Sequence, residues 1–314
     1  MAATRRHHDM SASNRYALIT AARNEEAYIG ATILSVTRQS ILPIKWAIVD
    51  DDSCDRTYDI ISEYAEKNAF ILPLHLEKSK EWSFKSKANA VNFGHQRLKD
   101  LQYDFLGILD ADITIDDRYY ENILDKFSQN PRLGLAGGMI SEMNNGKYVA
   151  QSYYLNSVAG AIQLFRRDCF EQVGGYIPSK RGGIDAIAEM MTRMHGWHVQ
   201  SFPEITVNHL RPTGLTKANI FKSRFIYGQR DYALGNHPLF MFLKCIHRFQ
   251  ERPYVIAGLL RMIGYGWSWI QREKRPIPES VVAFIQREQI KRMRSFSLYE
   301  MKGESFKHND RVIS

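Results

Sequence analysis

Short apolar runs alternate with helical patterns along the first third of the chain, and this alternation restricts its fold more than any other feature. Four runs have the length of buried strands: Tyr16–Ala21, Lys45–Val49, Phe70–Leu74 and Phe105–Leu109. The segments between them place apolar residues at helical spacing: Glu26–Gln39, Asp55–Lys67 and Ser86–Leu98. Strands that alternate with helices indicate a mostly parallel, doubly wound sheet flanked by helices. The sequence therefore predicts an α/β fold.

Acidic residues directly follow two of these predicted strands. Asp110 and Asp112 come straight after Phe105–Leu109, with Ala111 between them. Loops at the carboxyl ends of parallel strands form the ligand crevice of such sheets, and two carboxylates there can coordinate Mg²⁺ or Mn²⁺ through oxygen. A metal held in this way binds a diphosphate. The alternative interpretation is a solvated loop.

The second acidic cluster follows Lys45–Val49 and contains Asp50, Asp51 and Asp52. Crowded carboxylates repel one another, so we expect them to accept hydrogen bonds from a ligand such as a nucleobase or a ribose. Asp55 precedes a predicted helix, and we assign it the structural role of accepting from free N–H groups at the helix start. The loop from Ala21 to Glu26 presents polar groups on the same edge.

These segments resemble the family 2 glycosyltransferases, which have the nucleotide-sugar-binding fold called GT-A. The matching segments keep the order and spacing of the family and are Ile19–Glu26, Val49–Asp55, Lys87–Asn92, Asp110–Asp112, and Phe165–Arg167 through Gly174–Tyr176. The similarity covers roughly residues 16 to 215. Their joint match is much more specific than any single motif.

The resemblance implies a division of the chain. The expected parts are a disordered leader (1–14), a GT-A catalytic domain (15–215) with a nucleotide-sugar-binding half (15–140) and an acceptor half (141–215), a C-terminal helical annex (216–296) and a polar tail (297–314). Apolar residues at helical spacing from Lys217 onward support the annex.

The resemblance also implies roles for residues of the donor site. Asp50 contacts the base with Asp51 beside it, Glu25 helps to hold the nucleoside, and Lys87 meets phosphate or sugar. Ala21, Arg23, Asp110, Ala111 and Arg211 complete the expected nucleotide-sugar site. The expected metal ligands are Asp112, as the direct ligand, with Asp110 and His209, and the expected cofactor is Mn²⁺ or Mg²⁺.

Inverting transfer needs a general base that accepts the proton of the acceptor hydroxyl. The family supplies a carboxylate after a Gly-Gly-aromatic turn, usually as a Glu-Asp pair that opens a helix. This chain reads Arg181-Gly182-Gly183-Ile184-Asp185, so the first acid is missing. We predict that Asp185 is the base, with Glu189, one helical turn further, as the alternative. Asp185 as a mere helix cap also stays open.

Charge and cysteine content restrict location and partners. The net charge is +8, and Lys and Arg accumulate after Lys217. Acids at the predicted cleft argue against a nucleic-acid partner.

Cys54, Cys169 and Cys245 are far apart and have no metal-ligand spacing, which predicts neither a disulfide framework nor a zinc site. No apolar signal segment follows the basic start, so we expect a cytoplasmic protein.

The most apolar stretch, Pro253–Ile270, has Arg261 at its centre, which argues against a membrane-spanning helix. We expect it to pack against the catalytic domain. The alternative is an interfacial helix, with peripheral contact of residues 239–294 at the inner face of the membrane, because Tyr254, Tyr265, Trp267 and Trp269 suit lipid headgroups.

Together these features predict a glycosyltransferase that moves one sugar from a nucleotide-diphosphate donor to an acceptor hydroxyl on a glycan or lipid-linked glycan. A UDP-sugar is the favoured donor and a GDP-sugar the second choice. The segment Gln229–Tyr232 does not reproduce the Gln-x-x-Arg-Trp motif of processive relatives, so processive polymerisation is not expected. The alternatives are a nucleotidyltransferase, although Ala21–Glu26 lacks the glycines of its first loop, and a non-catalytic nucleotide-sugar-binding protein.

Overall fold

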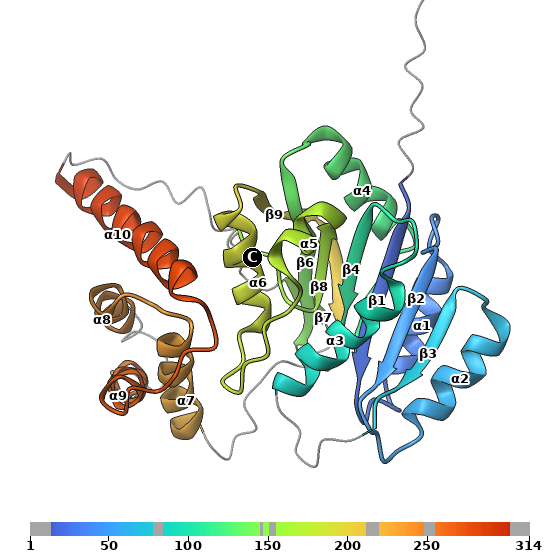
Figure 1. The fold of residues 1–314 in the computed structure, drawn as a ribbon, viewed down its shortest axis with the longest axis horizontal. Coiled ribbons are helices and arrows are strands. Elements are labelled where there is room, and N and C mark those ends of the chain that lie inside the picture. Colours follow the sequence, from blue (N-terminus) through green and yellow to red (C-terminus); the bar gives the residue numbers. More distant parts are fainter. Residues whose placement is uncertain are drawn as a thin grey trace, which may run out of the picture.

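The computed structural model describes residues 14–77, 84–144, 147–150, 155–211, 220–247 and 255–301. A sheet with helices on both faces forms the larger part of the molecule, and the helices of the annex lie beside it, at the left in Figure 1. The predicted leader, apart from residue 14, and residues 302–314 of the predicted tail lie outside the described residues.

The described residues form a sheet of nine strands in the order β3-β2-β1-β4-β8-β6-β9-β5, with β7 paired to β6. The strands are β1 Tyr16–Ala22, β2 Lys45–Asp50, β3 Ile71–His75, β4 Phe105–Leu109, β5 Ile113–Ile115, β6 Leu133–Asn144, β7 Lys147–Ala150, β8 Ile162–Arg166 and β9 His198–His209. β1–β4, β6 and β9 run in one direction, and β5, β7 and β8 run in the other. The expected mostly parallel sheet is confirmed.

Helices cover both faces of the sheet, as expected for a doubly wound fold. The described helices are α1 Ile29–Thr37, α2 Thr57–Lys67, α3 Phe84–Leu98, α4 Tyr119–Gln129, α5 Arg167–Val173, α6 Ile184–Met194, α7 Ile220–Ala233, α8 Pro238–His247, α9 Ile256–Ile270 and α10 Glu279–Met301. Buried residues of α1, α2 and α4 belong to the core on one face. Those of α3, α5, α6 and α10 belong to the core on the other.

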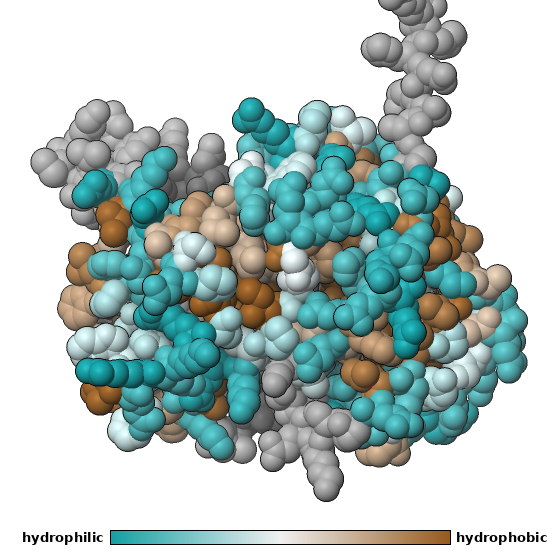
Figure 2. All heavy atoms as spheres, in the orientation of Figure 1, coloured by the Kyte–Doolittle hydropathy of each residue, from teal (hydrophilic) through white to brown (hydrophobic). Residues whose placement is uncertain are grey.

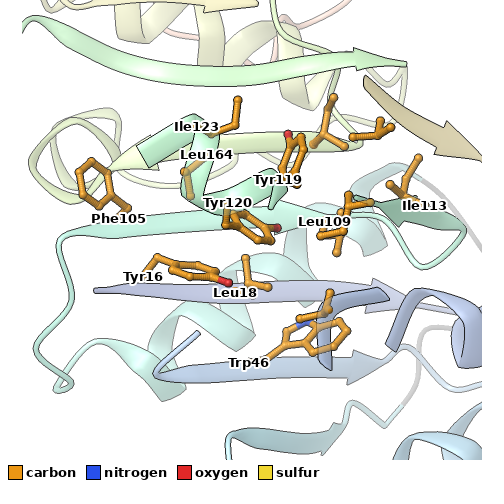
Figure 3. Close-up of a cluster of buried hydrophobic side chains, with 14 of the residues drawn as sticks. Tyr16, Leu18, Trp46, Phe105, Leu109, Ile113, Tyr119, Tyr120, Ile123 and Leu164 are labelled. Carbon is orange, nitrogen blue, oxygen red and sulfur yellow. The ribbon is translucent and has the colours of Figure 1, made fainter. Parts of the chain in front are cut away.

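Aromatic side chains fill the core beneath α1 and α4 (Figure 3). Tyr16 of β1 stacks on Tyr120 of α4 with ring centroids 4.4 Å apart, and its hydroxyl donates to the Ile41 carbonyl at 2.7 Å. The buried Trp46 indole donates to Thr20 Oγ1 at 3.0 Å, so its one polar atom is satisfied inside the core. This packing holds β1, β2 and β4 firmly, and their ends carry the candidate site.

The annex is built around a close contact between α7 and α9. Gly228 and Gly264 have no room for a side chain, because an added Cβ would lie 1.9 Å from the Arg261 carbonyl oxygen and 2.0 Å from that of Phe225, respectively. Glycine at both positions therefore lets the two helix backbones approach closely. Arg261, which the sequence placed at the centre of the apolar stretch, is buried and pairs with Asp231 of α7 at 2.5 Å.

Two boundaries and one packing expectation differ from the prediction. α10 continues to Met301, five residues beyond the expected end of the annex at 296. The predicted nucleotide-sugar-binding half ends at residue 140, but β6 continues to Asn144, because it pairs with β7 and β9 beyond Ile140. The expectation that α9 packs on the catalytic domain needs correction: it packs on α7 and α8, and α10 is the annex helix whose residues enter the core beside α6.

Candidate active site

The parallel pairing of the strands brings the predicted loops to one edge of the sheet. Ala22 of β1 lies beside Asp50 of β2, and Asp50 lies beside His75 of β3. On the other side of β1, β4 ends immediately before Asp110. Carboxyl ends of parallel strands form the ligand crevice of open α/β sheets. The geometry therefore gathers three of the loops chosen from the sequence into one region.

Asp50 is fully buried and holds one unsatisfied oxygen. Its Oδ2 accepts from the Ser53 N–H at 3.3 Å and lies 2.9 Å from His75 Nδ1. Its Oδ1 has no hydrogen-bond partner. A buried acceptor without a hydrogen-bond partner costs free energy. We therefore expect this oxygen to accept a hydrogen bond from an N–H group of a ligand. An N–H group on the edge of a nucleobase fits that requirement.

Arg23 offers a matching unsatisfied donor beside this carboxylate. Its Nη1 is buried without a hydrogen bond and lies 3.7 Å from Asp51 Oδ2. Arg23 and Asp51 directly follow β1 and β2, respectively, at the same edge of the sheet as Asp50. Ala21, also expected in the site, lies in β1 beside Val49.

Hydrogen bonds lock the first two loops to each other. Asn24 adopts a positive φ of 54°, which asparagine tolerates well, and its side-chain oxygen accepts from the Cys54 N–H at 2.9 Å. Asp55 accepts from the Glu26 N–H at 3.2 Å and from the Thr57 N–H at 3.0 Å. Asp55 thus makes the structural contacts predicted for it at the start of α2, and it keeps the two loops in place.

Glu25 and Arg211 close the site on the side of β9. Arg211 donates to Glu25 from a position directly after β9, and its guanidinium lies 5.1 Å from the centre of the Tyr28 ring. Burial raises the pKa of Glu25 to about 7, because the opposing charge of Arg211 is countered by Asp112 and Asp110 nearby. Glu25 is thus a partly buried acid on the side of the candidate site where Arg211 and Asp112 lie.

Asp112 and His209 meet where β9 pairs with β5. Ile113 lies directly beside His209 in this pairing, and His209 Nε2 lies 3.2 Å from Asp112 Oδ2. Burial raises the pKa of Asp112, but His209 and Arg211 outweigh it and hold that pKa below its ordinary value. Burial lowers the pKa of His209, but the contacts to Asp112 and Glu142 raise it more.

Lys87 and Asp110 form the third pair of the site. Lys87 Nζ lies 2.6 Å from Asp110 Oδ1. Burial raises the pKa of Asp110 more than Lys87 lowers it. Burial lowers the pKa of Lys87, but Asp110, Asp185 and Asp112 together raise it further. Lys87 thus stays positively charged at the centre of the acidic cluster, as a phosphate-binding group must.

The donor atoms of Asp112 and His209 fit a divalent metal ion. Among the described residues, no group of three or more His, Cys, Asp or Glu side chains could hold a metal. Asp112 and His209 supply one carboxylate oxygen and one imidazole nitrogen, donors that suit Mn²⁺. Metals of this kind commonly take further ligands from substrate phosphates and water. Asp110 is less available, because Lys87 occupies its Oδ1.

Asp185 lies in the first turn of α6. Its side chain lies against Gly160, where an added Cβ would be 2.5 Å from Asp185 Oδ2. Its carboxylate makes no hydrogen bond with any other described residue, and the residue at the helix cap is Gly183. Its negative charge lies within electrostatic range of Lys87 and Tyr176 and raises the pKa of both.

Glu189, the alternative base, is fully engaged in structural contacts. Its Oε2 accepts from Ser157 Oγ at 2.8 Å and from the Val158 N–H at 3.3 Å, and its Oε1 lies 2.5 Å from Arg193 Nη1. Burial raises the pKa of Glu189 despite these contacts. The geometry therefore separates the two candidates: Asp185 is free, and Glu189 holds α6 to the segment before β8.

Two contributors to the site were missed by the sequence analysis. His75 contacts Asp50, and Glu142 lies 3.3 Å from His209 Nδ1. Neither belongs to a local motif. His75 ends a strand just as Asp50 does, so the rule that polar residues gather at strand ends could have found it. Ala111, by contrast, was expected, and its carbonyl accepts from Thr32 Oγ1 at 2.7 Å.

The fold is a doubly wound α/β sheet whose candidate site lies at the carboxyl edge, where such sheets form their ligand crevice. The chain belongs to glycosyl transferase family 2, whose family model matches residues 17–182, more than half of the 314 residues. This confirms the resemblance drawn from the motifs and makes the chain a glycosyltransferase. The match ends three residues before Asp185, so the position of the base rests on the structure.

Curated relatives include two bacterial polymer synthases. The chain is 27% identical over 175 residues to the poly-beta-1,6-N-acetyl-D-glucosamine synthase of Staphylococcus epidermidis, covering 50% of this chain and 40% of that protein. It is 24% identical over 271 residues to the synthase of the same name from Staphylococcus aureus (strain COL), covering 80% of this chain and 62% of that protein. The chain thus spans less than two thirds of the length of these relatives.

Solved structures share the fold at low sequence identity. The mannosyltransferase PcManGT from Pyrobaculum calidifontis, in complex with GDP-Man and Mn²⁺, gives a TM-score of 0.53 at 16% identity over 82% of this chain and 75% of that chain. TarS of S. aureus gives 0.53 at 16% identity over 86% of this chain and 50% of that chain. These similarities confirm the expected GT-A fold.

Proposed function

We propose that this chain transfers a single sugar from a nucleotide-diphosphate donor to an acceptor hydroxyl on a glycan or lipid-linked glycan, with inversion at the anomeric carbon. The acceptor oxygen forms the new bond to that carbon, and the bond from the carbon to the diphosphate oxygen breaks. The acceptor proton passes to a carboxylate, and the nucleoside diphosphate leaves.

The nucleotide is held by the β1–β3 side of the site. Asp50 Oδ1 accepts from a base N–H, an interaction that its unsatisfied, buried state supports. Uracil and guanine both present an N–H on their pairing edge, so UDP and GDP can each donate to this oxygen. As in the sequence-based prediction, UDP is the favoured nucleotide and GDP the second. Lys87 offsets the charge of the diphosphate, and Arg211 lies close enough to Glu25 and Asp112 to assist it.

Asp112 and His209 are the side chains that would hold Mn²⁺ or Mg²⁺ against the diphosphate. The metal would stabilise negative charge on the departing diphosphate. Support comes from the donor atoms of this pair and from two solved structures of similar fold that are complexes with Mn²⁺, the mannosyltransferase above and GalNAc-T7 with UDP, GalNAc and Mn²⁺. The latter has a TM-score of 0.53 at 14% identity over 69% of this chain and 50% of that chain.

Asp185 is the proposed general base. The observation that carries the proposal is its carboxylate, which makes no hydrogen bond to another described residue and lies within electrostatic range of Lys87. Removal of the acceptor proton by a carboxylate on the face opposite the diphosphate produces inversion. The β-linked polymer in the names of the relatives is consistent with an inverting reaction from an α-linked donor.

Donor identity can be tested with a panel of UDP- and GDP-sugars, beginning with UDP-N-acetylglucosamine, in the presence of Mn²⁺. We expect one UDP-sugar to raise the melting temperature and to be slowly hydrolysed to UDP and free sugar. Release of pyrophosphate from a nucleoside triphosphate and a sugar phosphate would instead identify a nucleotidyltransferase. Stabilisation by a nucleotide sugar without turnover on any glycan acceptor would identify a non-catalytic binding protein.

A further inference from the structure

Helix α9 carries large apolar residues on the outside. Apart from Trp269, the exposed ones form one stripe at helical spacing: Ile256, Leu259, Ile263, Trp267 and Ile270. At 100° per residue these five side chains fall within an arc of about 80°. Soluble helices normally turn such a stripe toward the core. Here the stripe faces solvent and has no charged residue within it.

The inward face of α9 is the more polar one. Arg261 and Ser268 are buried there, the first paired with Asp231 and the second with Glu273 at 2.7 Å. Gly264 provides the backbone contact with α7 described above. The ion pair at Arg261 fixes the rotation of the helix, because turning the apolar stripe inward would expose that pair. The packing of the annex therefore holds the apolar stripe on the outside.

Helix α8, which packs on α9, presents a second apolar face. Its exposed members are Leu239, Phe242, Leu243 and Ile246, while Met241 and Cys245 face the annex core. Figure 2 shows hydrophobic side chains reaching the left edge of the molecule, where α8 and α9 lie in Figure 1. Exposed apolar side chains gathered on neighbouring helices indicate an interaction site. We call these nine exposed residues of α8 and α9 the annex face.

The annex is strongly basic. Residues 216–296 contain 15 Lys and Arg against five Asp and Glu, a net charge of +10, whereas the whole chain carries +8, so the rest carries −2. Exposed Arg272 and Lys274 follow directly after α9. An apolar helix face bordered by Trp and basic residues binds the interface of an anionic bilayer through both burial and charge.

We propose that the annex face docks on the surface of an anionic lipid bilayer, with α8 and α9 lying in the interfacial plane. No helix in the described part of the chain is long and apolar enough to cross a membrane, so α8 and α9 would enter only the interfacial region. A second copy of the chain is a poorer occupant, because two annexes of net charge +10 would repel one another.

Vesicle sedimentation tests this docking with the full chain. Vesicles of phosphatidylglycerol mixed with phosphatidylcholine should bind the chain at low salt, and vesicles of phosphatidylcholine alone should bind it much less. The double substitution Ile263→Glu with Trp267→Glu should lower the partition coefficient about tenfold or more, since it places charge in the apolar stripe. Leu42→Glu, which changes an equally exposed apolar residue far from the annex, is the matched control.

Melting temperatures of the variants show whether the fold is retained, and analytical ultracentrifugation reports the oligomeric state. The proposal is overturned if the parent chain does not bind the mixed vesicles, or if the folded double variant binds them as the parent does. It is also overturned if the parent is a dimer that the double variant dissociates, because the annex face is then an interface between copies. None of these readouts depends on donor binding or turnover.

Discussion

Asp185 and Glu189 lie one turn apart on α6, and the contacts of each assign them different roles. Glu189 is hydrogen-bonded on both oxygens and paired with Arg193, whereas Asp185 is free of hydrogen bonds to described residues. Glu189 binds one side of α6 to the core. Asp185 lies within electrostatic range of Lys87, and we propose that its carboxylate is the one available to a substrate.

Asp185→Asn should leave donor binding near normal and lower single-turnover transfer by about 10²- to 10⁴-fold, because the amide keeps the shape but cannot accept the proton. Glu189→Gln, the paired control, should lower the melting temperature and retain transfer. Loss of transfer in Glu189→Gln alone would identify Glu189, one turn further along the helix, as the base. A loss below about tenfold in Asp185→Asn would contradict its role as base.

Asp50→Asn should weaken binding of free UDP without metal by about tenfold or more, since the amide can turn an N–H toward the base and a charged hydrogen bond contributes roughly 1.5–3 kcal/mol. Metal-free calorimetric titration measures this. Asp59→Asn, an exposed substitution on α2, controls for the loss of one charge. Equal affinities in the parent and Asp50→Asn would leave the buried Oδ1 without a role in nucleotide binding.

Residues within short motifs were predictable, and residues joined by strand pairing were not. Asp50, Asp112 and Asp185 stand in local patterns, so the sequence predicts their place in the site. His75 carries only the local signal of a polar residue at a strand end, and its contact with Asp50, like that of Glu142 with His209, depends on the register of β2 with β3 and of β6 with β9. That register depends on long-range packing, so local spacing does not reveal which of these residues meet.

At the scale of elements, the parallel strands and their helices were predictable because each carries its own periodicity. The antiparallel strand β8 lies between β4 and β6, and this insertion depends on pairings distant in sequence. An outward apolar face of α9 was considered only in the alternative of an interfacial helix, because packing against the catalytic domain was expected. The sequence shows Arg261 in the middle of an apolar stretch but not the buried partner, Asp231, that turns it inward.

Asp231→Asn should destabilise the annex by about 3–5 kcal/mol, because it removes the carboxylate charge that pairs with the buried Arg261 at 2.5 Å. Burial raises the pKa of Asp231, but Lys244 and Arg261 lower it more, so the folded pKa lies below the unfolded one. The contribution of the ionised Asp231 to the stability of the folded annex is therefore complete above the unfolded pKa. This contribution is lost as pH falls below about 4. Chemical denaturation at neutral and acid pH measures both effects. Equal stability of parent and variant at neutral pH would contradict them.

Arg181 joins the loop before α6 to the annex. Its guanidinium contacts Glu273 at 2.9 Å and Gln229 at 2.8 Å. Arg181→Ala should lower transfer while retaining donor affinity, because it loosens the loop that leads to Asp185 without touching the nucleotide side. Arg181→Lys should recover part of the rate. Single-turnover kinetics and UDP titration separate the two quantities, and a parallel loss of donor affinity would contradict this positioning role.

At the scale of the whole molecule, the donor site has two sides carried by different strands. In the proposed function, the base side lies at β1–β3, around Asp50 and His75, and the metal side lies at β4 and β9, around Asp112 and His209. We propose that one nucleotide diphosphate bridges the two sides. The account therefore predicts that metal strengthens nucleotide binding only through the second side.

Calorimetric titration of UDP into the parent chain and into Asp112→Ala, each with and without Mn²⁺, tests this claim most directly. We predict that Mn²⁺ raises the affinity of the parent by at least about tenfold, or 1.4 kcal/mol. In Asp112→Ala this gain should disappear, while the metal-free affinity, which depends on Asp50, stays unchanged. The same Mn²⁺ dependence in parent and variant would contradict the assignment of Asp112 and, with it, the bridged donor site.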